Sequence, residues 1–227
     1  FRNVTGVQTC ALPIFQAKQE YELLSTLGEC DTMEMNRLQR EFTVITKREV
    51  ESIKVLIRAF GFSYVDSIGE ADVTCASLVY NKQAWACLTE DTDLFVYGCK
   101  RILRYFSLLK HTAILYYLPG MLTELDMTHD EFKSACILSG TDYYTVSPFI
   151  RIDAAFALLK QFKEQCTNKD TFYEWIHNTT KIKIDITKLT QTFNMFEPVA
   201  DVIVHQNSSY DEQSVKDFMQ QNDFIFI

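Results

Sequence analysis

The sequence predicts an α/β fold with a mainly parallel sheet flanked by helices. Runs rich in β-branched and aromatic residues alternate with segments whose apolar residues recur at helical spacing, and three of these segments open with a capping box. Such alternation is typical of parallel strands covered on both faces. With 227 residues, 47% of them hydrophobic, the chain can bury a sizeable core, so we expect one domain with helical elaborations.

The first residues need a separate interpretation. Residues 4–14, V-T-G-V-Q-T-C-A-L-P-I, resemble the in-frame translation of a widely used sequencing adapter joined to a natural reading frame near Phe15. The alternative is a genuine flexible tail. We therefore expect residues 1–14 to be an artefactual leader, residues 15–227 to hold the fold, and the natural protein to continue upstream.

Helices are expected at the start of the natural sequence. Residues 16–42 are rich in Glu, Gln, Lys, Arg, Leu and Met, and Gly28 is the expected break between the two arms of a helical hairpin. Thr46 and Glu49 form a capping box, and helical periodicity continues from there to Gly61, which favours a left-handed stop.

Strands and further helices follow. The runs expected to be strands are residues 62–65, 84–89, 101–106 and 114–118. Ser67 with Glu70 repeats the capping signature before a helix to about Tyr80, and Thr128 with Glu131 caps a helix that ends near Gly140. The later part of the chain is expected to be helical, on the periodicity of Ile152, Phe156 and Leu159, then of residues 172–176, then of Val215, Phe218 and Met219.

Composition excludes several classes of protein. The longest apolar runs fall well short of the ~20 residues that a membrane helix needs, and no charged-then-apolar leader opens the chain, so we expect a soluble intracellular protein. Cys75, Cys87 and Cys136 have apolar neighbours and are expected to be reduced core residues. No Cys-x-x-Cys pair occurs and the four histidines are isolated from one another, which argues against zinc.

The formal net charge of −8 argues at first against binding to nucleic acid, which clustered lysine and arginine drive. Carboxylates gathered around divalent cations would also make a sequence acidic, and the bound cations would then neutralise part of that charge. The charge therefore weakens a nucleic-acid hypothesis without excluding it.

Five carboxylates stand at the ends of expected elements. Asp91 and Asp93 follow the strand at 84–89, at the carboxyl end where α/β sheets place ligand sites, and an extended segment would point both to the same side. Glu70 and Asp72 open a helix, and Asp142 follows one. Carboxylate oxygens suit a hard cation.

Each of these residues also has a purely structural interpretation. Glu70 could complete the capping box of Ser67, and Asp72 could stabilise the first helical turn through the helix dipole. For this pair, the local sequence favours these structural roles over a role as metal ligands. The spacing of Asp91 and Asp93 is explained equally well by a role in forming a turn and by a role as metal ligands. Asp142 would face the negative end of a helix dipole unless a cation compensates, and its alternative role is an Asx-turn.

Three blocks carry a family resemblance. They are G-F-S-Y-V-D-S-I-G-E-A-D-V-T-C-A-S-L-V from Gly61, L-T-E-D-T-D-L-F-V-Y-G from Leu88 and C-I-L-S-G-T-D-Y from Cys136. In order and separation they resemble the internal region of the flap endonuclease and XPG-type structure-specific 5′ nuclease family. The similarity extends more weakly over residues 16–224, including the terminal D-E-Q-S-V-K-D-F-M.

The resemblance implies a PIN-like fold and a set of roles. Glu70 and Asp72 match the family's Glu pair with one shortening, Asp91 and Asp93 match its two strand-end aspartates, and Asp142 matches its last metal-site aspartate. In that family these groups hold two Mg²⁺ ions, which can activate water and stabilise the leaving oxygen of a phosphodiester. On this basis residues 15–60 are cap and connecting helices, 61–142 the sheet core with the acidic site, and 143–227 a helical DNA-binding-like region.

The chain also departs from the family pattern. The family's amino-terminal aspartates, first-helix amine and basic arch would precede Gln16, so the site is expected to be incomplete and the fragment inactive alone. The stretch V-S-P-F-I-R-I-D-A-A from Val146 lacks the glycines of the family's duplex-gripping hairpin, which puts that grip and its K⁺ site in doubt. The family's sliding-clamp tail is not visible before Ile227.

Candidate phosphate contacts in the cap are Arg37, Arg40, Lys47 and Arg48, although a solvated helix face with glutamates interspersed explains them at least as well.

The expected function is that of a Mg²⁺-dependent, structure-specific DNA endonuclease and 5′-to-3′ exonuclease. Its partners would be branched or flapped DNA in replication, repair or recombination, and a sliding clamp. A non-catalytic DNA-binding or scaffold relative is the alternative, and an RNA-directed nuclease on the same fold is not separable by sequence. The expected location is the nucleus, or a cytoplasmic replication site if the source is a virus.

Overall fold

A computed structural model describes residues 16–26, 32–43, 46–145, 149–165, 171–198, 202–204 and 209–222. The chain folds as two compact units, one formed by residues 1–65 with 204–227 and the other by residues 66–203. Residues 1–14 and Gly28, for which the sequence predicts a leader and a helical break, lie outside the described residues. In the part of the chain that is described, no helix is long and apolar enough to cross a membrane.

The first unit is helical. A helix at residues 16–26 and α2 (Thr32–Phe42) stand on either side of the expected break. The capping box of Thr46 and Glu49 is present at the start of α3 (Lys47–Ala59), and Gly61 adopts a φ of 77° just after that helix. Near the carboxyl end of the chain, α11 (Glu212–Gln221) lies against α3. The expected strand at residues 62–65 is wrong, because only Tyr64 forms an isolated bridge and its ring packs back on Lys54 and Arg58 of α3.

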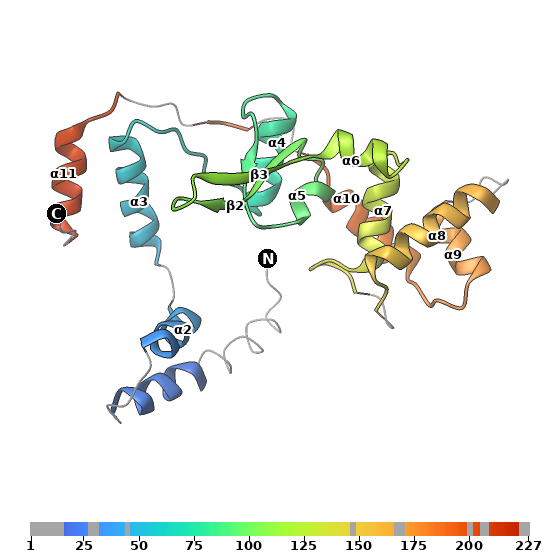
Figure 1. The fold of residues 1–227 in the computed structure, drawn as a ribbon, viewed down its shortest axis with the longest axis horizontal. Coiled ribbons are helices and arrows are strands. Elements are labelled where there is room, and N and C mark those ends of the chain that lie inside the picture. The colour runs from blue at the N-terminus through green and yellow to red at the C-terminus, as the bar shows by residue number, and fades with distance from the viewer. Residues whose placement is uncertain are drawn as a thin grey trace. The chain divides into compact units, whose positions relative to one another are not determined.

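The second unit holds the sheet (Figure 1). Its strands are β1 (Cys87–Leu88), β2 (Arg101–Ser107) and β3 (Thr112–Tyr117), in the order β1-β2-β3. The β1 strand pairs parallel with β2, and β2 pairs antiparallel with β3. The α/β class is confirmed, but the described sheet is mixed rather than mainly parallel. The reason is the short connection after Ser107, which can close a hairpin, whereas a parallel pair needs a crossover of a dozen or more residues.

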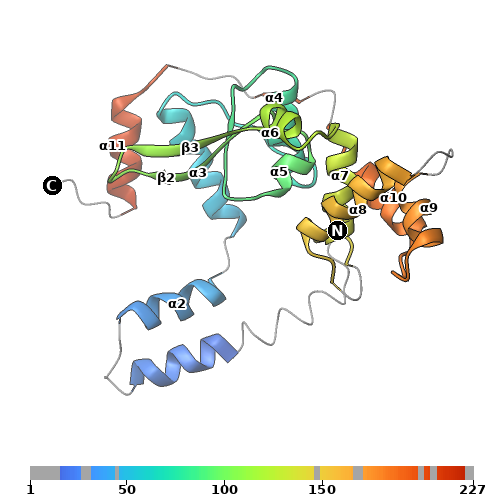
Figure 2. The same ribbon diagram turned by 45° about the vertical axis from the view of Figure 1, so that its right-hand side comes forward.

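Helices pack around and beyond this sheet. α4 (Ala71–Tyr80) and the single-turn α5 (Asp93–Val96) lie beside it, whereas α7 (His129–Ser139) and the next three helices along the chain gather at one end of the unit (Figures 1 and 2). The remaining helices are α6 (Leu118–Glu124), α8 (Ile152–Gln165), α9 (Phe172–Thr179) and α10 (Ile186–Met195). The capping box of Thr128 is present at α7, as predicted. The sequence analysis missed α5, α6 and α10. Asp185 caps α10 by accepting from the amide of Lys188.

The core of the second unit is continuous from the sheet into these helices. Its fully buried side chains include Leu94, Ile102, Ile137, Leu138, Leu159, Ile176, Leu189 and Phe196. Burying one such aliphatic or aromatic side chain stabilises the fold by roughly 1.5–3 kcal/mol. The α5 helix is short but carries three consecutive buried residues, so this core fixes its place firmly.

One charged side chain is buried in this core. Lys133 is only 2% exposed, and its Nζ donates to Oε1 of Glu197 at 2.7 Å and lies 3.9 Å from the centre of the Phe193 ring. Glu197 follows α10, so this ion pair ties the end of that helix to α7.

We predict that removing the two partners of this pair lowers stability by different amounts. Glu197→Gln leaves a buried ammonium without its counter-charge and should lower the free energy of unfolding by about 1–2 kcal/mol. Lys133→Met removes the buried charge and keeps the volume, so its cost should be smaller. Urea denaturation of both variants tests this, and a larger loss for Lys133→Met would show that the lysine contributes more than its pairing with Glu197.

Candidate functional site

Glu70 and Asp72 stand at the entrance to α4. The helix begins at Ala71, so the capping box predicted from Ser67 is wrong and Glu70 occupies the N-cap position itself. The preceding Gly69 has a φ of 102°, which interrupts helical geometry before it can start at Ser67. The Glu70 side chain makes no capping hydrogen bond and is exposed, whereas Asp72 is partly buried. Glu70 therefore does not act as the partner of Ser67 in a capping box.

Asp91 and Asp93 follow β1 in a turn, not in an extended segment. Oδ1 of Asp91 accepts from the amide of Asp93 at 2.8 Å, and Asp93 opens α5. The prediction that both side chains leave an extended strand on one side is therefore wrong, because β1 already ends at Leu88. One oxygen of Asp91 thus has the turn-forming role that the sequence allowed.

The neighbouring Glu90 anchors this turn to the sheet. Its Oε1 accepts from the amide of Tyr105 at 2.6 Å, and its backbone oxygen accepts from Nη2 of Arg104 at 2.9 Å. The amide of Thr89 also donates to the oxygen of Leu103 at 3.1 Å. These contacts with β2 hold the turn that carries Asp91.

Asp142 lies in a tight turn after α7. The turn is closed by reciprocal backbone hydrogen bonds between Thr141 and Tyr144, of 2.8 and 3.2 Å, and the Thr141 hydroxyl accepts from the amide of Tyr143. Thr141, rather than Asp142, thus supplies the side-chain hydrogen bond in this turn. The Asp142 side chain is exposed.

The five carboxylates act on one another electrostatically. Burial, together with the charges of Asp91, Asp142 and Asp72, raises the pKa of Asp93 to about 6. Burial likewise raises the pKa of Asp72, with contributions from Asp91 and Glu70. Carboxylates from the entrance of α4, the turn after β1 and the turn after α7 therefore share one neighbourhood.

The chemistry of this group suits a hard divalent cation. In the described part of the chain, none of the five carboxylates forms an ion pair with lysine or arginine, so no basic side chain there neutralises their charges. Oxygen ligands of this kind are those that Mg²⁺ takes. Among the described residues, however, no three His, Cys, Asp or Glu side chains converge closely enough to hold a metal ion. Shared ligation therefore requires these side chains to move inward.

Two tyrosines under the carboxylates were missed by the sequence analysis. The hydroxyls of Tyr97 and Tyr143 lie 3.3 Å apart, and both rings contact Phe196, with centroid distances of 4.7 and 5.5 Å. Burial is the main cause that raises the pKa of Tyr97. The hydrogen bond with Tyr143 and the charges of Asp93 and Glu70 also raise it. The available signal was proximity in sequence, because Tyr97 is one helical turn after Asp93 and Tyr143 directly follows Asp142.

Comparison with known proteins finds similarity in the segment that carries this site. The family model described as the XPG I-region matches residues 61–142, which include all five carboxylates. Residues 61–142 are similar to the XPG I-region. The resemblance to XPG-type flap endonucleases that the sequence blocks carry is thereby confirmed.

Individual relatives extend the match beyond the I-region. The chain is 35% identical over 133 residues to flap endonuclease 1 of Branchiostoma floridae, covering 57% of this chain and 35% of the relative. The flap endonuclease-1 structure from Methanococcus jannaschii matches with a TM-score of 0.64 at 17% identity, over 87% of this chain and 61% of that one. The catalytic core of Rad2 in complex with DNA substrate matches with a TM-score of 0.63 at 19% identity, over 83% and 67%. The chain thus spans about a third of the Branchiostoma relative, and the two structures establish the fold.

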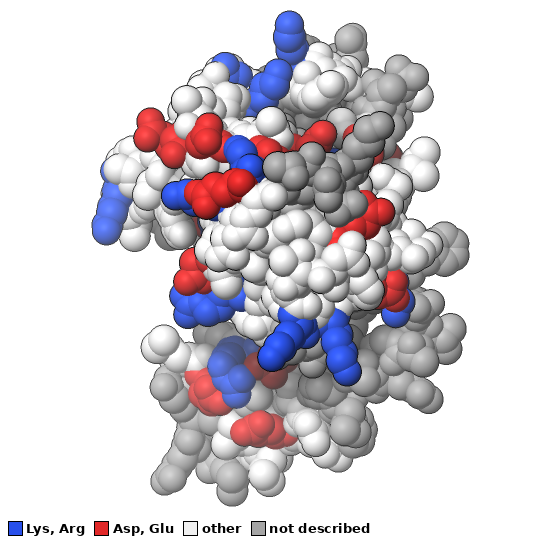
Figure 3. All heavy atoms as spheres, turned by 90° about the vertical axis from the view of Figure 1, so that its right-hand side faces the viewer, with Lys and Arg blue, Asp and Glu red and all other residues white. Residues whose placement is uncertain are grey.

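The candidate phosphate contacts lie outside the I-region, in the first unit. Arg37 pairs with Glu34 at 2.7 Å and also with Glu41, as expected of a solvated helix face. Arg40 lies in the last turn of α2, and Lys47 and Arg48 open α3. On the face drawn in Figure 3, the coloured acidic and basic side chains are interspersed and do not form one continuous basic surface.

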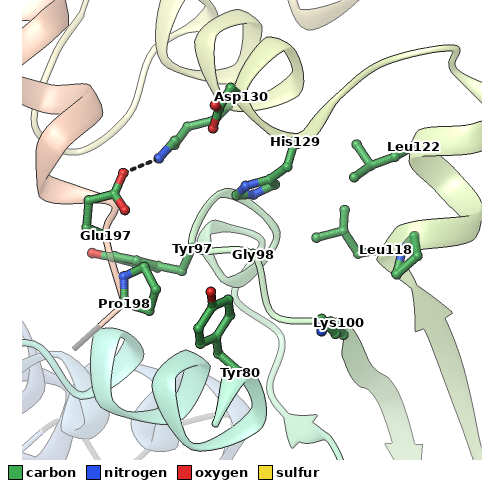
Figure 4. Close-up of a pocket in the computed structure, with 12 residues that line it drawn as sticks. Tyr80, Tyr97, Gly98, Lys100, Leu118, Leu122, His129, Asp130, Glu197 and Pro198 are labelled. Carbon is green, nitrogen blue, oxygen red and sulfur yellow. Dashed lines mark hydrogen bonds and ion pairs between the residues drawn. The ribbon is translucent and has the colours of Figure 1, made fainter. Parts of the chain in front are cut away.

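The I-region also borders a cavity of about 320 Å³ (Figure 4). The cavity lies between Tyr80, Tyr97, His129 and the Lys133–Glu197 pair. The ring of His129 comes so close to Gly98 that a Cβ there would lie 3.0 Å from it, and Nε2 of His129 is 3.2 Å from the oxygen of Phe95. None of the five carboxylates lines this cavity, so the cavity is not part of the acidic site.

We predict that Asp93→Asn stabilises the metal-free protein. The raised pKa means that the ionised carboxylate is disfavoured in the folded state at pH 7, and the amide removes that charge. After allowance for solvent screening of a half-buried group, the gain should be about 1 kcal/mol. Thermal unfolding in a chelator tests this, with Glu124→Gln on the exposed surface as a control expected to change stability by less than about 0.5 kcal/mol. A clear loss of stability in Asp93→Asn would show that the ionised carboxylate makes a favourable contact.

Proposed function

We propose that this chain is part of a structure-specific nuclease that hydrolyses phosphodiester bonds of branched or flapped DNA, with flap endonuclease and 5′-to-3′ exonuclease activity, in replication, repair or recombination. The observation that carries the proposal is the group of five carboxylates within the I-region, which lack cationic partners among the described residues. The names of the relatives and the DNA complex of a protein of the same fold support the substrate class.

Glu70, Asp72, Asp91, Asp93 and Asp142 are the residues that we propose to hold divalent cations, with two Mg²⁺ ions in the complete protein. Bound Mg²⁺ would supply activation of the attacking water and stabilisation of the leaving oxygen. The tyrosines and Phe196 beneath the site would keep the turns at Asp93 and Asp142 together against the repulsion of their charges. Glu90, held by Tyr105 and Arg104, would keep Asp91 in place during the reaction.

DNA is proposed to approach with its backbone near these carboxylates and to be held by basic residues elsewhere. Arg40, Lys47 and Arg48 are the better candidates in the first unit, because Arg37 is already paired with two glutamates. A sliding clamp as partner and a nuclear location complete the proposal. Both follow from the family resemblance rather than from a contact in this chain.

A non-catalytic scaffold relative is the competing proposal. It is favoured by the lack of three convergent ligands among the described residues. Against it, ionised carboxylates that repel one another lower the stability of the metal-free fold, and a scaffold has no use for them.

We predict that Asp91→Asn and Asp142→Asn each abolish cleavage of a 5′-flap DNA while DNA binding is retained or strengthened. The amide keeps the shape and removes a charged ligand, which should cost several kcal/mol of transition-state stabilisation, and one less negative charge reduces repulsion of phosphate. Cleavage and binding should be measured on this chain joined to the rest of its own reading frame.

Asp126→Asn is the matched control, because this exposed residue has a φ of 52°, which asparagine also tolerates. The control should cut normally. If Asp91→Asn or Asp142→Asn also cuts normally, or loses folding and binding together, that residue is a structural turn former and the proposed role is wrong.

We also predict that residues 15–227 alone cleave flap DNA little or not at all in Mg²⁺. The family resemblance assigns further metal ligands to sequence upstream of Gln16, and in-line displacement needs rigidly held metals. A gel-based cleavage assay of the purified chain tests this. Robust cleavage would show that the five carboxylates suffice.

A further inference from the structure

Three cysteine side chains gather where α4 meets the sheet. The Cys87 thiol in β1 donates to the backbone oxygen of Cys75 in α4 at 3.3 Å, and the Cys99 thiol donates to the oxygen of Arg101 at 3.4 Å. Interaction with the thiols of Cys75 and Cys99, together with burial, raises the pKa of the Cys87 thiol. Cys87 is therefore the middle member of the trio.

The three thiols differ in exposure. Cys75 is exposed, which corrects the expectation that it is a core residue, whereas Cys87 and Cys99 are buried. Contact with Cys87 lowers the pKa of the Cys75 thiol to about 7, against the raising effects of partial burial and of the Asp72 charge. For comparison, burial raises the pKa of the Cys136 thiol to about 12. An accessible thiol beside a buried partner is the arrangement of oxidisable cysteine pairs.

We propose that Cys75 and Cys87 form a redox-sensitive pair that a hydroperoxide, such as hydrogen peroxide, converts to a disulfide. The Cys75 thiolate attacks one peroxide oxygen, the O–O bond breaks, and the departing hydroxide takes up a proton to give water. The resulting sulfenic acid is attacked by the Cys87 sulfur as that thiol loses its proton, so that the S–S bond forms and the S–O bond breaks. The hydroxide released in this second step takes up the proton to give a second water. Two thiols are oxidised by two electrons, and one hydrogen peroxide is reduced to two waters.

The position of the pair gives the bond a structural effect. Cys75 comes three residues after Asp72 in α4, and Cys87 comes four residues before Asp91. A disulfide between them would covalently join α4, whose start carries Glu70 and Asp72, to β1, which leads into the turn of Asp91 and Asp93. The disulfide itself does not depend on the proposed function, whereas any effect on cleavage would rest on it.

Tryptic mapping of the peroxide-treated chain under non-reducing conditions tests the proposal. Cleavage after Arg58, Lys82 and Lys100 places Cys75 in the peptide 59–82 and Cys87 with Cys99 in the peptide 83–100. We expect these two peptides to appear as one cross-linked species that dithiothreitol separates. A disulfide within peptide 83–100, or peptide 59–82 carrying Cys75 as sulfinic acid, would overturn the proposed pairing.

Variants distinguish which buried thiol reacts. Cys87→Ser and Cys87→Ala should each abolish the cross-linked species, whereas Cys99→Ser and the distant control Cys136→Ser should retain it, with folding of each checked by circular dichroism. Alkylation of the reduced wild-type chain with iodoacetamide provides a readout that needs no variant, and Cys75 should react at least about tenfold faster than Cys136. Equal or slower alkylation of Cys75, or a cross-link lost in Cys99→Ser but kept in Cys87→Ser, would overturn the proposal.

Discussion

Packing of three aromatic rings is the constraint on which the acidic site depends. Tyr97 follows the short helix that Asp93 opens, Tyr143 lies beside Asp142, and the buried ring of Phe196 contacts both. Ionised carboxylates repel one another, so the turns that carry them would separate without such a contact. Dispersion and burial of large rings supply a favourable term of several kcal/mol, which is enough to offset that repulsion.

The same contact explains why the helical part of residues 66–203 matters to a site on the sheet. Phe196 and Glu197 follow α10. The ring of Phe196 contacts the two tyrosines, and Glu197 forms an ion pair with Lys133 of α7. The end of α10 therefore supports the elements that hold Asp93 and Asp142. In this unit the site is assembled from segments up to 126 residues apart along the chain, from Glu70 to Phe196.

Local signals in the sequence predicted the helices well and the sheet poorly. The capping boxes at Thr46 and Thr128 were correct because a cap is satisfied by residues within one turn. Ser67 and Glu70 show the same spacing, yet Gly69 adopts a positive φ and moves the helix start to Ala71, which the spacing alone does not reveal. The direction of β3 depended on the short connection after Ser107, a feature visible in the sequence that favours a hairpin over a parallel crossover.

The candidate carboxylates themselves were found from element ends and from the family blocks, but their surroundings were not. Which oxygen of Asp91 closes a turn, and how Thr141 rather than Asp142 supplies the hydrogen bond of the next turn, depend on backbone torsions that residue types do not specify. The contacts of Phe196 and the exposure of Cys75 are tertiary, so periodicity within one segment could not indicate them.

Asp91 and Asp142, from turns that are far apart in the sequence, are proposed to ligate the same divalent cation. Isothermal titration of Mn²⁺ into the wild-type chain, into Asp91→Asn, into Asp142→Asn and into the double variant measures this directly as a thermodynamic cycle. We expect each single substitution to weaken binding at least about tenfold and the double substitution to add much less than the sum of the two losses, since both act on one site. Losses that add fully, or single variants that bind as the wild type does, would contradict the shared site.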